Sequence, residues 1–325
     1  MSYTVTQESF ASLASYWTKP THSLPWNIVF VLPAWLEVWW QAFGTGAKLN
    51  LAVVREGGQI IGVAPLKVTG KTASFVGSAD VCDYLDFIIA PGREADFFNA
   101  LVDDLKQKGI TYLDLRPVRP DSTVLTNLVD TIKKRGGEVL CQPEDVSFEM
   151  HLPVTWEEYL ESLASKQRHE VRRKLRRLLE EGKIDYHCFK TGEGLDDFMS
   201  TFLKLFVVSR EDKANFMTPR MEAFFRSLAE AMAGIGLLRT GVLELDTWPV
   251  AMILGFDYND CMYLYNSAFD PQYRALSVGL LSKVLCIKES IEEGKKRFDF
   301  LKGDETYKHH LGGREVPIYG CQITI

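Results

Sequence analysis

A short segment near the C-terminus, residues 298–313 (FDFLKGDETYKHHLGG), concentrates side chains that can donate, accept or move a proton. An alternating strand pattern runs into Asp304, Tyr307 and Lys308. Acyl transfer to an amine or a hydroxyl needs a polarised carbonyl, a route for a proton and a positioned acceptor. We therefore expect Lys308 to stabilise an oxyanion or a phosphate, and Tyr307 or Asp304 to relay a proton. The two adjacent histidines of the segment diverge in any regular structure, so we expect them to be exposed and not catalytic.

A second candidate is the junction between a strand and a helix in QYRALSVGLLSKVL, residues 272–285. N–H groups at a helix N-terminus, together with the positive end of the helix dipole, suit phosphate oxygens. A glycine lets the backbone come close, and an arginine adds a charged fork. The candidate cofactor-binding residues are Arg274, Ser277, Val278 and Gly279. The alternative is an ordinary helix cap with Ser277 as the N-cap residue.

The densest run of charge lies in residues 165–183, SKQRHEVRRKLRRLLEEGK. Its apolar residues recur at helical spacing and form one stripe, so the basic side chains cover the rest of the helix surface. Two interpretations stay open: a solvated helix face, or a docking surface for an anionic partner such as tRNA, a nucleotide-diphosphate donor or phospholipid. The residues expected to carry such a surface, within helix 166–177, are Arg168, Arg172, Arg173 and Arg176.

A cluster of acids surrounds the start of a strand in SADVCDYLDFI, residues 78–88. Asp83, Tyr84 and Asp86 are candidates for binding a substrate amine, and a carboxylate among them for acting as a general base. They fit equally well as turn residues that bind their own backbone. Their spacing matches no metal site, and we predict no metal.

The bulk properties of the 325-residue chain narrow the class of protein. The formal net charge is −6, which argues against a protein that coats nucleic acid. No apolar run reaches the roughly 18 residues that a membrane helix needs. The six cysteines are scattered without a C-x-x-C pair, so we expect a reduced, cytoplasmic protein without structural zinc or disulfides. The G-x-S-x-G, Walker, H-E-x-x-H and G-x-G-x-x-G motifs do not occur in the sequence.

Helices and strands are mixed along the whole chain. Helical periodicity predicts helices at 33–43, 93–108, 121–135, 155–181, 194–209, 218–233 and 277–293. Strand patterns occur at 49–55, 59–67, 73–76, 84–89, 111–115, 146–151, 184–189, 236–245, 249–257, 261–267, 297–301 and 318–324. Several strands follow one another across short turns. The pattern therefore predicts a mixed α/β fold with antiparallel meanders rather than a doubly wound parallel sheet.

The order of elements repeats at long range. A strand around Ala64 leads through further strands and a helix to a strand around Asp114, and the same order runs from Ala251 to Asp299. The offsets of 187 and 185 residues between the matched positions are nearly equal. This similarity indicates a duplicated unit. We place the boundary near residue 150, with an N-terminal domain at 1–150 and a C-terminal domain at 151–325 that carries the cofactor loop.

Three pieces of the sequence carry a family resemblance: LASKQRHEVRRKLRRL, the run from YRALSVG to KHHLGG, and DYLDFII. Over roughly residues 30–313 the chain resembles the BioF2-like or CelD-like acetyltransferases of the GNAT fold, which are related to the FemAB aminoacyltransferases. This resemblance implies tandem GNAT-like domains and an N-acyltransferase that uses acetyl-CoA, another acyl-CoA or an aminoacyl-tRNA. The pyrophosphate loop of the family would map to residues 274–279, with Ser277 in place of the middle glycine. The resemblance also supports a role for Lys308.

These observations lead to three hypotheses. The first is an acyltransferase that acts directly from donor to acceptor, without a covalent enzyme intermediate. The acceptor would be an amine or hydroxyl of a cell-envelope, polysaccharide or small molecule. The second is an aminoacyl-tRNA-dependent ligase of the Fem type, with helix 166–177 facing the tRNA. The third is a non-catalytic exopolysaccharide assembly factor.

Overall fold

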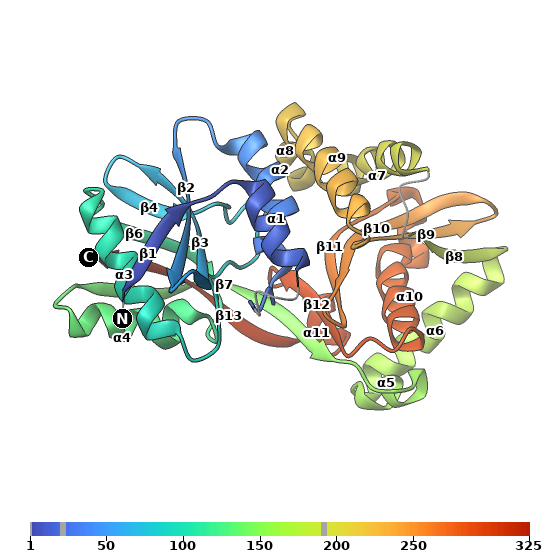
Figure 1. The fold of residues 1–325 in the computed structure, drawn as a ribbon. Helices are drawn as coiled ribbons and strands as arrows, with labels where there is room; N and C mark the ends of the chain where they lie inside the picture. Colours follow the sequence, from blue (N-terminus) through green and yellow to red (C-terminus); the bar gives the residue numbers. More distant parts are fainter. Residues whose placement is uncertain (1, 20–23, 190–193) are drawn as a thin grey trace. The chain divides into compact units, whose positions relative to one another are not determined.

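The structure is a computed structural model that describes residues 2–19, 24–189 and 194–325. The chain forms two compact units: one contains the residues up to Val146 together with Val316–Ile325, and the other contains Ser147–Glu315 (Figure 1). We call them unit 1 and unit 2. The last ten residues, expected in the C-terminal domain, belong to unit 1 because their strand pairs there.

Unit 1 contains a sheet with the strand order β1-β2-β3-β4-β6-β13-β7, and β5 pairs with β3. The strand pairs β1–β2, β2–β3, β3–β4, β3–β5 and β6–β13 are antiparallel, and β4–β6 is parallel. Helix α3 packs on β1, β2 and β3, where Gly62 leaves room for the Phe97 ring. The elements are β1 (Tyr3–Gln7), α1 (Phe10–Thr18), η2 (Val29–Val31), α2 (Pro33–Phe43), β2 (Lys48–Glu56), β3 (Gln59–Thr69), β4 (Thr72–Phe75), β5 (Ile88–Ile89), α3 (Glu94–Gln107), β6 (Tyr112–Val118), the π-helical turn η3 (Val124–Leu128), α4 (Val129–Lys134), the first part of β7 (Val139–His151) and β13 (Arg314–Thr324).

Unit 2 contains a sheet with the strand order β7-β12-β11-β10-β9-β8. Only β11–β12 is parallel among its ladders over the described residues. Helix α10 packs against β9, β10 and β11, and its apolar side chains form much of the core. The elements are the end of β7, α5 (Trp156–Ser162), α6 (Ser165–Glu181), β8 (Ile184–Phe189), α7 (Leu195–Ser209), α8 (Glu211–Phe216), α9 (Pro219–Gly234), β9 (Leu238–Leu245), β10 (Trp248–Tyr258), β11 (Cys261–Phe269), η4 (Pro271–Leu276), α10 (Val278–Glu292), β12 (Arg297–Lys302) and α11 (Thr306–His310).

The mixed α/β class with antiparallel meanders is confirmed, and the repeated order of elements lies on matching parts of the two units. Ala64 is in β3 and Ala251 in β10, each in the middle strand of a meander. Asp114 pairs with Ser74 across β4–β6, and Asp299 pairs with Tyr263 across β11–β12. In each unit, the chain therefore forms an antiparallel meander and a helix, and the strand after the helix pairs in parallel with the last strand of the meander.

The structure contains β1, α1 and α8, which were not expected, and β7 begins at Val139 rather than at 146. It also departs from the expected elements in three other places. The single helix expected at 155–181 is two helices, because Leu163 is extended (ψ 147°) and buried between α5 and α6. The strand expected at 84–89 is reduced to β5, since most of that segment runs without a regular ladder. The polar segment after β12 forms the short helix α11.

Two of the six cysteines are not free. Cys141 in β7 and Cys321 in β13 form a disulfide, and their Cα atoms lie 4.2 Å apart. The expectation of a chain without disulfides is wrong for this pair, because β7 and β13 are neighbours in the sheet although the cysteines are 180 residues apart. Cysteine usage therefore no longer argues for a reducing, cytoplasmic environment. The free cysteines are Cys82, Cys188, Cys261 and Cys286.

Among the described residues, none of the helices has the length and apolar character required to cross a membrane.

Candidate active site

The two parallel strands of unit 2 separate soon after they meet. β11 and β12 pair at Cys261–Arg297, Met262–Phe298 and Tyr263–Asp299, and no further pair follows. Residues 264–269 of β11 and 300–302 of β12 therefore continue without each other as partners. We call these two diverging segments the β11–β12 fork. Its β11 arm leads through η4 to the N-terminus of α10, and its β12 arm leads to α11.

A strained turn directs the β12 arm away from β11. Leu301 has φ 62°, in the left-handed region that a bulky side chain rarely adopts. The register with β7 shifts between Asp299 and Leu301, and the Asp299 carboxylate accepts a hydrogen bond from the Leu301 N–H at 2.8 Å. Such strain persists only where surrounding contacts impose it, and here a buried lysine supplies those contacts.

Lys308 holds this turn in place. Its side chain is only 2% exposed, and Nζ donates to the carbonyls of Leu301 (2.9 Å), Lys302 (2.6 Å) and Gly303 (3.0 Å). Glu305 Oε2 lies 3.0 Å from the same nitrogen. An ammonium has three N–H donors, so these carbonyls engage all of them. The geometry gives Lys308 a structural task at the β12 arm.

The other two expected catalytic residues differ in exposure. Burial raises the pKa of Tyr307 well above its ordinary value, so its hydroxyl stays protonated. Asp304 is exposed, and its carboxylate lies 2.9 Å from His309 Nε2. His309 in turn packs against the Phe148 ring, with 4.5 Å between ring centroids. Tyr307 therefore lies beside the fork, whereas Asp304 faces solvent.

Two lysines that the sequence analysis did not select also lie at the fork. Lys283 of α10 is 6% exposed; its Nζ donates to the Gly279 carbonyl at 2.6 Å and lies 4.9 Å from the centre of the Tyr307 ring. Lys213 of α8 donates to the carbonyl of Ser267 on the β11 arm. Burial, with the neighbouring Lys213 charge, lowers the pKa of Lys283 to about 7. Burial, with the nearby Arg210, lowers the pKa of Lys213 to about 8.

Only one of these two lysines had a signal in the sequence. Lys283 interrupts the apolar run LLSKVLCI and follows Gly279 by one helical turn, which places it on the buried face of α10. Lys213 lies in the polar stretch REDKANF, and nothing in that pattern separates it from an ordinary surface lysine.

The expected phosphate loop, residues 274–279, forms a tight turn that leads directly into α10. Ser277 is in the left-handed region (φ 58°, ψ 30°), and its side chain makes no capping hydrogen bond to α10. Gly279 lies so close to Phe269 that a Cβ there would be 2.9 Å from the ring. Val278 is buried and Arg274 is exposed. The first N–H groups of a helix have no partner within it, so this end of α10 can accept an anion.

A pocket of about 260 Å³ lies beside the same helix end. Lys166, Lys174 and Glu170 of α6 line it, with Leu280 of α10 and His310 of α11. Helix α6 thus brings two lysines close to the first turn of α10. Cationic side chains and a helix N-terminus in one place favour a phosphate-bearing ligand.

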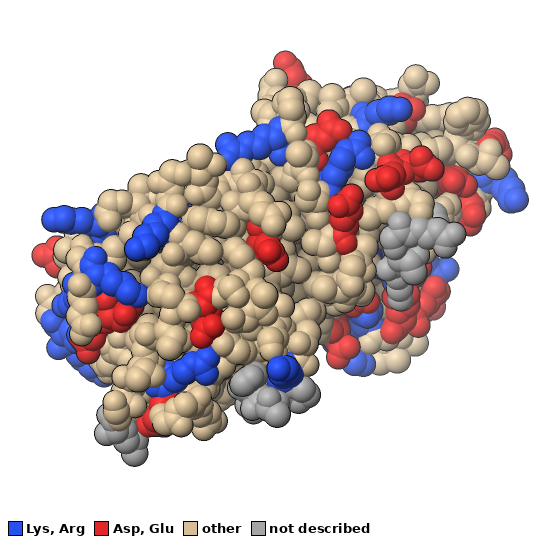
Figure 2. All heavy atoms as spheres, turned by 45° about the horizontal axis from the view of Figure 1, so that its top comes forward, with Lys and Arg blue, Asp and Glu red and all other residues tan. Residues whose placement is uncertain are grey.

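The four arginines expected to form a docking surface lie on α6. Arg172 and Arg173 are exposed and form ion pairs with Glu157 (3.2 Å) and Glu170 (2.9 Å). Arg176 is exposed and Arg168 is half-buried. On the face drawn in Figure 2, basic and acidic side chains are interspersed.

The acid cluster expected to bind a substrate lies in unit 1 and is largely buried. Asp86 accepts hydrogen bonds from the N–H (2.7 Å) and hydroxyl (2.6 Å) of Thr123 and from the Phe87 N–H (2.9 Å). Burial raises the pKa of Asp86 to about 6, against the opposing effect of these hydrogen bonds. Tyr84 is buried beneath Arg119, whose guanidinium lies 5.0 Å from the ring centre. Asp83 is half-buried. Asp86 and Tyr84 therefore serve packing and turn formation.

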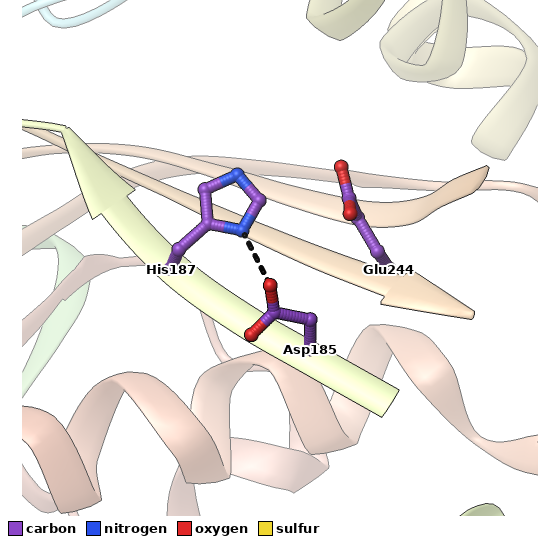
Figure 3. A group of neighbouring side chains, drawn as sticks. All are labelled: Asp185, His187 and Glu244. Carbon is purple, nitrogen blue, oxygen red and sulfur yellow. Dashed lines mark ion pairs between the residues drawn. The ribbon is translucent and has the colours of Figure 1, made fainter. Parts of the chain in front are cut away.

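Two groups of side chains in unit 2 have the composition of a metal site. Asp185 and His187 on β8 lie beside Glu244 on β9, with ligand atoms within 4.8 Å of one another (Figure 3). Asp185 faces Glu244 directly across the ladder, and His187 Nδ1 lies 3.6 Å from Asp185 Oδ2. The second group, Asp304, His309 and Glu315, is exposed throughout. We assign neither group a role in the fork.

Comparisons with known proteins bear on the fold of the chain. The family model described as an acetyltransferase (GNAT) domain matches residues 165–309, from α6 to α11. The fold is similar to that of FemX, with a TM-score of 0.67 and 14% identity over 98% of this chain and 96% of that one.

Two further solved structures share the fold. A conserved protein of unknown function from Bacteroides thetaiotaomicron has a TM-score of 0.62 at 11% identity, over 100% of both chains. The C-terminal domain of a putative lysylphosphatidylglycerol synthetase from Agrobacterium fabrum has a TM-score of 0.56 at 11% identity, over 85% of this chain and 83% of that one. No curated protein sequence matches the chain.

Proposed function

We propose that the chain transfers an acyl group from an acyl-CoA directly to an amine or hydroxyl of its acceptor. The match of residues 165–309 to the acetyltransferase (GNAT) domain model and the fold shared with FemX support this proposal. In this proposal the β11–β12 fork of unit 2 is where the acyl group meets the acceptor. The acceptor would be a cell-envelope, polysaccharide or small molecule.

One observation carries the proposal: the fork and a phosphate-suited helix end are consecutive in the chain. The β11 arm separates from β12 after Tyr263 and runs directly into η4 and α10. A donor whose phosphates lie at Val278 and Gly279 can therefore extend its acyl end along β11 toward the fork. Arg274 would contribute a charged hydrogen-bond donor.

In this proposal Lys308 is a positioning residue of the fork, and Tyr307 takes part in proton transfer. Lys308 holds the turn at Leu301 and so determines the direction of the β12 arm. Tyr307 keeps its proton because of its raised pKa, and its hydroxyl can relay a proton: it donates to the leaving thiolate as it accepts the proton that the attacking amine or hydroxyl loses. When bound, the donor supplies a thioester carbonyl that is activated toward attack. Asp304 is exposed and contributes through His309 at most.

The basic residues of α6 support a donor that carries phosphates. Lys166 and Lys174 line the pocket beside Leu280, in the first turn of α10. Both therefore lie near the helix end proposed for the pyrophosphate. The surroundings fit a polyanionic donor, because two cations and a helix N-terminus converge there.

The first experiment is calorimetric titration of the full chain with acetyl-CoA and with CoA. We expect a Kd in the micromolar range, corresponding to about −8 kcal/mol. Arg274→Ala should weaken binding about tenfold through loss of a charge-assisted contact. Arg226→Ala is the matched control, because Arg226 pairs with Glu222 on α9 and lies outside the fork. Absence of binding to both ligands would contradict the acyl-CoA proposal.

A second donor is favoured by the similarity to FemX and by the arginines of α6. In this alternative an aminoacyl-tRNA supplies the acyl group, and Arg168, Arg172, Arg173 and Arg176 contact its backbone. Binding of charged tRNA should then fall steeply with salt, with a slope set by the number of phosphates neutralised. Filter binding at several salt concentrations tests this, and a salt-independent signal would oppose it. A chain that binds neither donor would fit the non-catalytic assembly factor.

A further inference from the structure

The fork of unit 2 contains more buried positive charge than its own acids balance. Lys213, Lys283 and Lys308 converge there, and Glu305 is the carboxylate that acts on all three. Buried charges are normally paired or fully hydrogen-bonded, because an ion loses its hydration on burial. Lys308 meets this condition through three carbonyls and Glu305. The other two lysines do not.

Lys213 and Lys283 each keep donors available. Within the described parts of the chain, Lys283 Nζ has one hydrogen-bond acceptor, the Gly279 carbonyl, and Lys213 Nζ has one, the Ser267 carbonyl. An ammonium carries three N–H groups. Neither lysine lies within ion-pair distance of a carboxylate among the described residues. Each therefore has spare donors, Lys283 in a buried setting and Lys213 in a half-buried one.

The two lysines come from helices α8 and α10 and contact different parts of the fork. Lys213 contacts the β11 arm at Ser267, which lies four residues beyond the last β11–β12 pair at Tyr263. Lys283 lies over the ring of Tyr307, which follows the β12 arm. The charge of Lys213 is close enough to help lower the pKa of Lys283, after the larger effect of burial. A bound anion between the arms would remove this repulsion.

We propose that Lys213 and Lys283 form an anion subsite in the β11–β12 fork, and that the acceptor carries a carboxylate or a phosphate near the group that is acylated. Calling the bound molecule the acceptor rests on the proposed acyl transfer. The anion subsite itself does not depend on which donor the protein uses. Tyr307, between the subsite and α11, would then lie next to the reacting group. The substrate class is an anionic amine or alcohol.

The subsite predicts a pH dependence of anion binding. Lys283 is faced by Lys213 from α8, by Glu305, Tyr307 and Lys308 around α11, and by Cys286 on its own helix. Lys213 is faced by Arg210, Asp212 and Glu305. Both lysines must be protonated to hold an anion. Because the pKa values of about 7 and about 8 lie near neutrality, binding should weaken as the pH rises above about 8.

The test is the thermal unfolding midpoint of the full chain as a function of succinate and, separately, of inorganic phosphate, at constant ionic strength set with chloride. A ligand that binds the folded state raises the midpoint by mass action. We expect a saturable rise with an apparent Kd of about 1 mM for the anion that matches the acceptor. Lys283→Met and Lys213→Met should each weaken it at least about tenfold.

The matched controls separate this subsite from others. Lys288→Met changes an exposed lysine of the same helix and should keep the wild-type response. Arg226→Ala should also keep it, because Arg226 pairs with Glu222 on α9 and lies outside the fork. A response to succinate assigns a carboxylate, and a response to phosphate assigns a phosphate. A rise of the midpoint that survives both lysine substitutions, or no rise with either anion, would overturn the subsite.

A third arm distinguishes the acceptor from the donor. If CoA removes the response to the small anion, and Lys283→Met weakens CoA binding as much as Arg274→Ala does, the anion held is the donor's and the acceptor assignment falls. If acetyl-CoA fails to bind while the lysine-dependent anion response remains, the subsite stands and the acyl-CoA proposal fails.

Discussion

The parallel strand pairs of the two units start alike and end differently. In unit 1, β4 and β6 pair at three positions, 72–74 with 112–114, as β11 and β12 do at 261–263 with 297–299. Beyond its pairs, unit 1 fills the space beside β6 with its own chain: the Leu85 N–H donates to the Pro117 carbonyl at 2.8 Å, and Asp86 binds Thr123. Unit 2 instead places ionisable side chains there.

The lysines of the two units sharpen the contrast. Lys67 of unit 1 donates to the carbonyls of Phe75 and Gly77, just after β4, and lies 4.6 Å from the centre of the Trp39 ring. Lys308 of unit 2 donates in a similar manner to the carbonyls of the last two residues of β12 and of Gly303. Lys283 and Lys213 have no such saturation. The two units thus share a parallel strand pair but differ beyond it. In unit 1 the lysine next to the pair donates to backbone carbonyls and has a structural role, whereas in unit 2 two lysines keep spare hydrogen-bond donors.

The largest expected effect is at Lys308. Lys308→Met should lower the free energy of unfolding by about 3–5 kcal/mol, because three carbonyls lose their donor and the strained Leu301 turn loses its support. Urea denaturation followed by circular dichroism measures this loss. A variant with wild-type stability and no activity would restore Lys308 to a purely catalytic role.

Substitution of Lys67, the counterpart of Lys308 in unit 1, should lower the free energy of unfolding by a smaller amount. Lys67→Met should cost about 2 kcal/mol in the same denaturation experiment, since two carbonyls lose their donor while a buried charge is removed. Binding of acetyl-CoA to this variant should equal that of the wild type. If Lys67→Met abolishes donor binding while the protein stays folded, the division between a structural and a functional end is wrong.

Unlike Lys308 and Lys67, Lys283 should lower the stability of the folded protein, and the size of this effect should depend on pH. Its pKa in the folded protein, about 7, lies below the ordinary 10.5, so the folded state releases a proton that the unfolded state keeps. The stability of the wild type should therefore rise between about pH 7 and pH 10. The full shift corresponds to about 5 kcal/mol, and we expect about 2 kcal/mol because buried sites relax around a charge.

Comparison with Lys283→Met isolates this contribution. The variant should be more stable than the wild type at about pH 6.5, and the difference should shrink toward about pH 10. Lys288→Met should show no such trend, because Lys288 is exposed on the same helix. A difference between Lys283→Met and the wild type that does not change with pH would mean that Lys283 is not held in a depressed protonation state.

The smallest effect is expected on the surface of α6. Arg172→Ala removes an exposed ion pair with Glu157 and should change the free energy of unfolding by less than about 0.5 kcal/mol. The same variant also tests binding. If α6 faces tRNA, the slope of the logarithm of the tRNA affinity against the logarithm of the salt concentration should decrease by about one for each arginine removed. An unchanged slope, with an unchanged affinity, would leave α6 as a solvated face.

The order of elements was readable from the chain because it depends on local periodicity. Apolar residues at helical and strand spacing predicted α10 and the β9–β10–β11 meander almost to their ends, and the offsets from Ala64 to Ala251 and from Asp114 to Asp299 placed matching strands in the two units. The break at Leu163 was missed, since a continuous pattern cannot show that one apolar residue packs better with extended backbone.

The amino-acid sequence by itself determined the mixed α/β class, the repeated order of strands and helix, and the position of the α10 N-terminus with Ser277 and Gly279, because each follows from neighbours within a few residues. Only the tertiary structure decided which charges are buried and satisfied. Lys308 lies in a polar segment and Lys283 in an apolar run, yet it is Lys308 that meets three carbonyls and Lys283 that meets one. Cys141 and Cys321 meet across 180 residues because β7 and β13 are neighbours in the sheet. Partners that arrive from distant strands leave no mark in local pattern.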